Sequence, residues 1–385
     1  MTTFLYVLLA IVVLLFMVMV HELGHYIAGK ILKFKIDEFS IGFGKAIFSR
    51  TSKKTGEKFS LRIFPLGGYC SFYGEEDDGK AISADVVEVK DKPFNEQKPW
   101  KRIIVFLAGV TMNFLTAILF SWILLCSVGY DVPQIVDYST TVNVNESGES
   151  IFQKNDVITH INGKKIDFAF GVNFVDAVNN VKSSAKEFYE RETYDFDTDG
   201  YYTFSMTVRR DGERVELPSV KVMQEIVPPQ EEGGEETYRY LIGLENDNKV
   251  CTTAYRYGFF EGLGRSFSMA FGFAWVVLKS LWMLITFQIP ITEMGGTVTT
   301  IATMAEYTKV NPANLLIFIP LISANLAVFN LLPFPALDGA HVLFTVIEWI
   351  RKKPIDRKVE NTIHFVGICV LFAFVVLVDI LHFLL

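Results

Sequence analysis

A His-Glu-Leu-Gly-His sequence at residues 21–25 lies inside a long apolar run, which begins at Phe4 and reaches its first lysine at Lys30. The run is long enough to cross a bilayer, which takes about 20 residues. It lacks the basic start and the small-residue cleavage site of a signal peptide, so we predict a mature membrane helix. An ionisable residue inside such a helix costs about 2.5–3.5 kcal/mol on insertion scales, so Glu22 indicates a functional site.

The spacing of the two histidines suits a metal ion. Residues four apart on a helix share a face, so the imidazoles of His21 and His25 can bind one ion. Glu22 lies on an adjacent part of that face, where it can act on a metal-activated water without being a ligand. The alternative is a pair of core histidines that satisfy each other, but that arrangement leaves Glu22 without a partner.

A third ligand is expected, because catalytic zinc sites usually have three protein ligands and one open position. The stretch Asn330–Gly339 places two prolines and an aspartate at the end of an apolar run. Two such close prolines interrupt a helix, and interrupted backbone at membrane depth must be buried in protein or line a cavity. We therefore predict Asp338 as the third ligand and rank His341 second. An ordinary proline kink that leaves Asp338 at the membrane surface is the alternative.

Four apolar runs are predicted to cross the membrane: residues 4–28, Ile103–Val128, Leu315–Leu332 and Phe365–Leu385. Lysine and arginine concentrate in the loop between the first two runs and in a cluster at residues 351–358. The positive-inside rule places both basic loops in the cytoplasm, and four spans then leave both termini outside. Phe267–Ile289 is also apolar, but a fifth crossing would move the second basic cluster outside. We therefore predict interfacial or re-entrant packing for Phe267–Ile289.

The region between the second and third spans is predicted to be an aqueous domain. Residues 156–166 alternate apolar and polar side chains and contain an Asn-Gly turn, which predicts a strand and a hairpin. Residues 204–210 and 215–222 repeat this pattern, and residues 172–181 are predicted to be helical. Two acidic or turn-rich stretches, residues 183–203 and 224–240, are predicted to be surface insertions or linkers.

The HELGH helix, together with Asn330, Pro333, Pro335 and Asp338-Gly339, resembles the site-2 protease family of intramembrane zinc metalloproteases (M50), in particular its bacterial RseP-type branch. This resemblance implies His21, His25 and Asp338 as zinc ligands and Glu22 as the catalytic base. Residues 59–69 resemble the membrane-associated β-hairpin of the family. The resemblance also implies residues that handle an unwound substrate: Asn325 and Asn330, and the hairpin strand with Phe59, Leu61 and Ile63, to whose edge the substrate pairs.

The expected fold is a polytopic α-helical membrane protein with about four transmembrane helices, a membrane-associated β-hairpin and an extracytoplasmic PDZ-like α+β domain. Residues 1–128 hold the first two spans, HELGH and the hairpin loop on the cytoplasmic side, and residues 129–223 the PDZ-like domain. Residues 224–312 are a linker with the interfacial or re-entrant helix, and residues 313–385 hold the last two spans. Residues 147–150 and 152–155 depart from the peptide-binding pattern of PDZ domains, which favours a steric cover or filter.

The expected function is cleavage of transmembrane segments of single-span membrane proteins within the lipid bilayer of a bacterial inner or plasma membrane. The resemblance suggests anti-sigma factors and remnant signal peptides as substrates. A net charge of −7 gives no reason to expect nucleic acid as a partner. One alternative is a catalytically inactive scaffold, although Glu22 and its neighbouring histidines are intact. The other is a zinc transporter, which would place ionisable residues along several spans, whereas Ile103–Val128 has none.

Overall fold

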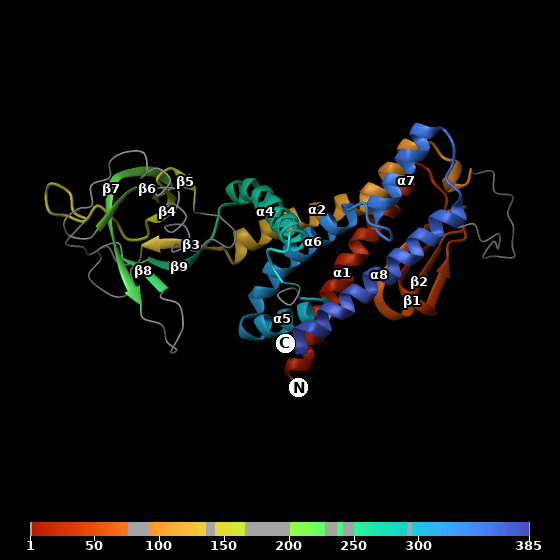
Figure 1. Ribbon diagram of the computed structural model, residues 1–385, viewed down its shortest axis with the longest axis horizontal. Helices are drawn as coiled ribbons and strands as arrows, with labels where there is room; N and C mark the ends of the chain where they lie inside the picture. Colours follow the sequence, from red (N-terminus) through yellow and green to blue (C-terminus); the bar gives the residue numbers. More distant parts are fainter. Residues whose placement is uncertain are drawn as a thin grey trace. The chain divides into compact units, whose positions relative to one another are not determined.

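The computed structural model describes residues 2–75, 92–135, 143–165, 201–227, 237–241, 250–290 and 295–384. The chain divides into two compact units, whose elements are labelled in Figure 1. A helical unit contains Met1–Ile123 and Leu263–Leu385, and a β-rich unit contains Leu124–Gly262.

Every apolar run that was predicted to span the membrane forms a helix. The long helices are α1 (Thr2–Ile31), α2 (Pro99–Ser127), α4 (Phe259–Ile285), α6 (Leu315–Leu331) and α8 (Arg357–Leu384); α5 (Thr297–Val310) and α7 (Asp338–Arg351) are shorter. Helix α8 begins earlier than Phe365, because the Asp356 side chain accepts a hydrogen bond from the Lys358 N–H and caps the helix there. As predicted, α6 ends just before Pro333 and Pro335.

The outward faces of the long helices are apolar. On α8, for example, Phe365 is 67% exposed and Phe372 is 72% exposed, which is typical of helices that face lipid rather than water. Five helices are long and apolar enough to cross a membrane: Thr3–Ile31, Pro99–Ser127, Phe259–Ile285, Pro312–Leu331 and Arg357–Leu381. The fifth candidate is α4, for which the sequence favoured interfacial packing, so a count of four spans stays a prediction.

Two apolar clusters hold the helical unit together. One packs α1 against α5 and α6 through side chains that include Met17, Met304 and Ile322. The other joins the end of α1, the hairpin and α2 through Phe34, Phe72 and Phe106, among others. Helix α1 ends where Lys33 takes a positive φ and the Phe34 N–H bonds to the Gly29 carbonyl, a Schellman ending that turns the chain into the hairpin.

The hairpin consists of antiparallel strands β1 (Ile36–Thr51) and β2 (Lys58–Phe72). Its register differs from a simple two-stranded ribbon, because β1 pairs with both ends of β2. Phe39 pairs with Phe59 and with Cys70, and Phe59 also pairs with Arg50. The backbone of Phe59–Leu61 is therefore flanked by β1 on both sides, whereas the Gly68–Cys70 part of β2 pairs with β1 on one side only among the described residues.

The β-rich unit is an antiparallel sheet in the order β8-β7-β6-β4-β3-β9, with β5 paired to β4. The predicted hairpin at the Asn-Gly turn is confirmed by β4 and β5. The predicted strand pair at residues 204–222 is confirmed by β6 and β7. The strands are β3 (Tyr130–Ile135), β4 (Val157–Ile161), β5 (Lys164–Lys165), β6 (Tyr201–Arg210), β7 (Glu213–Val227), β8 (Thr237–Leu241) and β9 (Val250–Tyr255).

The boundaries of this unit differ from the expectation. Residue 223 lies inside β7, which continues to Val227 and pairs with β8, and β9 pairs with β3, so the compact unit extends to Gly262. The described residues of the expected linker at 224–240 are thus mainly strand, as are residues 201–203. There Met223–Val227 of β7 pairs with Thr237–Leu241 of β8. The predicted helix at residues 172–181 lies outside the described residues.

Candidate metal centre

Three side chains from the two ends of the chain converge between α1 and α7. His21 and His25 lie on α1, and each is 7% exposed. Asp338 is the first residue of α7, and its Oδ2 lies 2.9 Å from the His21 Nε2 and 3.4 Å from the His25 Nε2. The two Nε2 atoms are 3.1 Å apart. The structure thus brings together the three residues that the sequence singled out as candidate ligands.

A hydrogen bond on the far side of the His25 ring decides which of its nitrogens can bind a metal. The His25 Nδ1 lies 2.8 Å from the Val105 carbonyl oxygen, and it must donate because a carbonyl can only accept. In neutral His25, Nε2 therefore carries a lone pair, and this lone pair faces the His21 Nε2 and a carboxylate oxygen. A nitrogen lone pair and a carboxylate oxygen that meet beside a second imidazole in a buried place favour a cation between them.

The separations of the three atoms fit zinc. Zinc bonds of about 2.0–2.2 Å in tetrahedral geometry place ligand atoms about 3.3–3.6 Å apart. Of the three separations, 3.4 Å falls in that range, and 2.9 and 3.1 Å lie a few tenths of an ångström below it. The donor set of two imidazoles and one carboxylate also matches catalytic zinc sites, which keep a fourth position open.

Helix α2 orients both imidazoles. The Asn113 side-chain amide lies 3.2 Å from the His21 Nδ1, and Asn113 is fully buried. With the Val105 carbonyl at His25, each candidate ligand ring has a partner on its other nitrogen, which fixes its rotation. Neither Val105 nor Asn113 was predicted from the sequence to orient a ligand. Asn113 could have been noticed in the sequence, because it is a polar amide inside an otherwise apolar run. The role of Val105 could not, because its backbone carbonyl does not depend on the residue type.

Two glycines allow this close arrangement. A Cβ atom on Gly109 of α2 would lie 2.5 Å from the His25 Nε2 and 2.8 Å from the His21 Nε2. A Cβ on Gly24 of α1 would lie 2.4 Å from the Ala108 carbonyl oxygen. Any side chain at Gly109 would therefore occupy the space in front of the imidazoles, and any side chain at Gly24 would separate α1 from α2.

Glu22 lies beside the candidate metal centre but does not belong to the group of three. It is half-buried, and its carboxylate accepts a hydrogen bond from the Cys70 backbone. A Cβ on Gly68 would lie 3.4 Å from the Glu22 Cγ. The glutamate therefore faces the Gly68–Cys70 part of β2, the part of the strand that pairs with β1 on one side only.

Among the described residues, those predicted to bind substrate make no hydrogen bond or ion pair with the three candidate ligands. Asn325 is exposed and Asn330 is half-buried on α6, and among the described residues no hydrogen bond joins either to the three candidate ligands. On β2, Phe59, Leu61 and Ile63 have exposed side chains, but the backbone of Phe59–Leu61 has no free edge. The sequence predicted edge pairing of a substrate to the 59–69 hairpin; within it, Phe59–Leu61 offers no edge, because β1 pairs with it on both sides.

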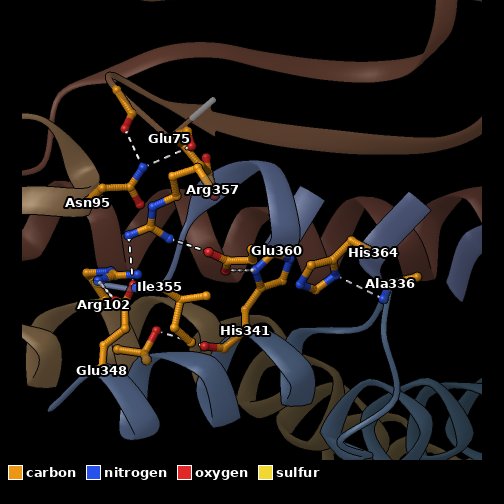
Figure 2. Close-up of polar contacts among 12 residues, drawn as sticks. Glu75, Asn95, Arg102, Ala336, His341, Glu348, Ile355, Arg357, Glu360 and His364 are labelled. Carbon is orange, nitrogen blue, oxygen red and sulfur yellow. Dashed lines mark hydrogen bonds and ion pairs between the residues drawn. The ribbon is translucent and has the colours of Figure 1, made fainter. Parts of the chain in front are cut away.

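His341, the second-ranked ligand, lies on α7 away from the group of three. Its ring stacks on Phe106 of α2 at a centroid distance of 5.0 Å and on His364 of α8 at 4.0 Å. Figure 2 shows His341 in a polar cluster that also contains Glu348, Arg357 and Glu360. The structure thus assigns Asp338 and His341 to two different groups.

The family model of Peptidase family M50 matches residues 9–374. The chain belongs to peptidase family M50. Relatives in bacteria carry the name "Putative zinc metalloprotease". One from Fusobacterium nucleatum is 27% identical over 379 residues, which cover 97% of each chain. One from Clostridium perfringens is 28% identical over 381 residues, again with 97% of each chain covered. One from Rickettsia conorii is 26% identical over 372 residues, with 96% of each covered.

Family membership confirms the broad sequence prediction. This M50 peptidase is a zinc metalloprotease of the site-2 protease type, and its cofactor is Zn²⁺. With its apolar helices, it is a multi-pass membrane protein.

Proposed function

We propose that this M50 peptidase cuts the transmembrane segments of other membrane proteins inside the bilayer. His21, His25 and Asp338 hold the zinc ion, and Glu22 is the catalytic base. The observation that carries the proposal is the convergence of two buried imidazole nitrogens from α1 and a half-buried carboxylate oxygen from α7, 2.9 to 3.4 Å apart. This convergence lies on α1, a candidate membrane span with apolar residues on both sides of the histidines.

When bound there, zinc supplies a Lewis acid that activates a water molecule and the scissile carbonyl. Glu22 takes a proton from the water as its oxygen attacks the carbonyl carbon. The C–N bond then breaks, and Glu22 passes that proton to the leaving amine. The Val105 carbonyl and the Asn113 amide keep the imidazoles in register through both steps.

A transmembrane helix must unwind before it is cut, because its peptide bonds are covered by its own hydrogen-bond ladder. The unwound segment pairs with the Gly68–Cys70 part of β2, which among the described residues pairs on one side only and which adjoins Glu22. Phe59, Leu61 and Ile63 contribute exposed apolar side chains to the same hairpin. Asn330 donates a hydrogen bond to the substrate backbone, and Asn325 assists on α6.

The proposed setting is a bacterial inner or plasma membrane, with both termini and the β-rich unit outside the cytoplasm. The basic loops around the hairpin and at residues 351–358 support this orientation. The β-rich unit is a PDZ-like steric filter of the RseP type, which admits single-span proteins with short external parts. Anti-sigma factors and remnant signal peptides are substrates of this kind.

The test is cleavage of a single-span reporter by purified full-length protein in lipid vesicles, with zinc counted in parallel. Glu22→Gln is expected to keep its zinc and to lose cleavage, because it lacks the base but none of the ligands. Glu306→Gln changes an exposed glutamate on α5 and serves as the matched control, with wild-type cleavage expected. Undiminished cleavage by Glu22→Gln, or a wild type that neither cuts reporters nor holds zinc, would contradict the proposal.

A further inference from the structure

The loop between α6 and α7 holds Asp338 in an unusual backbone conformation. Ala336, two residues before Asp338, has a φ of 91°, which residues other than glycine rarely adopt. Such a conformation costs about 1–3 kcal/mol and persists only where the surroundings enforce it. The position of Asp338 therefore depends on what holds Ala336.

A histidine on another helix holds it. The Ala336 N–H donates a hydrogen bond of 3.0 Å to the Nδ1 of His364 on α8, as Figure 2 shows. His364 is 9% exposed, so its ring offers an acceptor that water does not replace easily. One turn further along α8, a Cβ on Gly367 would lie 2.4 Å from the Pro335 carbonyl oxygen. The α8 backbone thus packs directly on the loop beside the hydrogen bond.

The ring of His364 is itself fixed. It stacks on His341 at a centroid distance of 4.0 Å and an interplanar angle of 11°. His341 in turn stacks on Phe106, which follows Val105 on α2. A three-ring stack therefore runs from the helix that orients His25, through α7, to the histidine that holds the Asp338 loop.

His341, Glu360 and His364 could also be taken for a second metal site, since their ligand atoms lie within 4.8 Å of one another. The hydrogen bonds argue against it. Because the His364 Nδ1 accepts the Ala336 N–H, neutral His364 carries its proton on Nε2, and neither nitrogen has a lone pair left for a metal. Glu360 is already paired with Arg357, and face-to-face rings do not point their lone pairs at one ion.

We propose that His364 is a positioning residue for the zinc ligand Asp338. Its Nδ1 holds the Ala336 N–H, and this bond fixes the left-handed turn from which Asp338 reaches His21 and His25. The inference rests on the proposed function, in which Asp338 binds zinc. It assigns His364 no contact with substrate or with the ion.

Three substitutions of His364 distinguish the role of its hydrogen-bond acceptor from the role of its stacked ring. His364→Asn places an amide oxygen near the position of Nδ1 and keeps the acceptor. His364→Gln places its oxygen near the position of Nε2 instead, and His364→Phe keeps an aromatic ring on His341 but has no acceptor. The measurement is the rate at which purified full-length protein in detergent loses zinc to an excess of chelator. The absorption spectrum of the cobalt-substituted protein is recorded alongside, because it reports the ligand geometry.

His364→Phe and His364→Gln are expected to release zinc about tenfold faster than the wild type, as for other residues that orient metal ligands. His364→Asn is expected to stay close to the wild type in both rate and cobalt spectrum. The inference is overturned if the Phe and Gln variants hold zinc like the wild type, if Asn releases it as fast as Phe, or if the wild type holds two zinc ions. Should the Phe variant fail to fold, the Asn and Gln pair decides the same question.

Asp338→Asn distinguishes this inference from the function on which it rests. Wild-type zinc retention in Asp338→Asn would remove Asp338 from the ligand set, and both proposals would fail. Loss of zinc in Asp338→Asn, together with wild-type retention in His364→Phe and His364→Gln, would leave the ligand set standing and overturn the positioning role alone.

Discussion

The Asn113 amide lies 3.2 Å from the His21 Nδ1, and this contact joins the second membrane helix to the first histidine of the metal centre. When Nε2 of a histidine binds a metal, Nδ1 carries the proton and needs an acceptor. Asn113 Nδ2 is the atom placed beside Nδ1, and a half-turn of the amide exchanges it with Oδ1, which has no hydrogen-bond partner among the described residues and can accept. Since the Val105 carbonyl does the same for His25, one helix sets the orientation of both candidate ligand rings.

Asn113→Leu is therefore expected to weaken zinc binding without removing a ligand. The substitution keeps the apolar packing of α2 but leaves the His21 Nδ1 without a partner, and such changes typically cost 10- to 100-fold in metal affinity. Competition with a chelator of known affinity measures the effect. Thr111→Ala changes an exposed residue of the same helix and should leave zinc affinity unchanged. An unchanged affinity in Asn113→Leu would remove α2 from this role.

Gly109→Ala is expected to abolish zinc binding. The added Cβ would lie 2.5 Å from the His25 Nε2, closer than any real contact allows, so the imidazoles must turn away from the site. Gly264→Ala on α4 is the matched control, because nothing lies within 4 Å of the Cβ it adds. Zinc counted by atomic absorption in the two purified variants compares them directly. Full occupancy in Gly109→Ala would contradict the site geometry.

Glu348→Ala is expected to destabilise the helical unit by about 3–5 kcal/mol. The Glu348 carboxylate joins α2 to α7 through Arg102 at 2.7 Å, and it also bonds Arg357 at 3.1 Å (Figure 2). Both Arg102 and Glu348 are almost fully buried, so removal of the carboxylate leaves a buried guanidinium unpaired.

Denaturant unfolding in detergent measures the loss of stability. The double variant Arg102→Met with Glu348→Leu should recover much of it, because it buries no charge. If the double variant were no more stable than Glu348→Ala, the ion pair would not be the cause.

The hairpin is expected to loosen in acid. Burial raises the pKa of the Glu38 carboxyl, but hydrogen bonds from neighbours such as Arg62 outweigh burial and hold its pKa below the ordinary value. A carboxyl with a lowered pKa in the folded state stabilises the fold above its unfolded pKa of about 4.3. This stability is lost as the pH falls through the folded pKa.

The protection of amide hydrogens in β1 and β2, taken relative to the intrinsic exchange rate at each pH, should therefore stay high down to a pH of about 5 and fall at lower pH. Arg62→Met removes a partner of the Glu38 carboxylate. It therefore raises the pKa of Glu38 and should move the loss of amide protection to higher pH. Exchange in β6 and β7 serves as the internal reference. Identical pH profiles in the wild type and Arg62→Met would show that Glu38 does not control the hairpin.

Removal of zinc is expected to lower the melting temperature of the wild type. A ligand at a free concentration of 1,000 times its Kd stabilises a protein by about 4 kcal/mol, and a strong chelator withdraws that contribution. Asp338→Asn should melt at a lower temperature and respond little to the chelator. A melting temperature of the wild type that the chelator leaves unchanged would mean that zinc does not stabilise the fold.

The sequence predicted the parts of the molecule that depend on local spacing. The HELGH spacing was enough to predict that the two imidazoles lie together, because any helix places His21 and His25 on one face. The prolines at 333 and 335 predicted the end of α6, and the depth of Asp338 predicted its approach to the histidines. These predictions needed no knowledge of how the helices pack.

The sequence could not predict contacts that arise only from packing. The bond from His25 to Val105 uses a backbone carbonyl, and Gly109 matters only because α2 lies against the two histidines. The pairing of Phe59 with both Phe39 and Arg50 depends on how β1 curls around β2, which the strand pattern does not encode. The bond from His364 to Ala336 likewise joins residues far apart in the sequence.

The candidate ligands lie far apart in the sequence, with two members near residue 20 and the third at residue 338. A growing polypeptide on the ribosome has both histidines early, yet it lacks the carboxylate until α7 has been translated. With Asp338 as the proposed third ligand, metal capture and proteolytic competence come only after α1 to α6 have been translated. A truncated product that ends before α7 has HELGH but no complete site, so premature termination yields an inert protein instead of an unregulated protease.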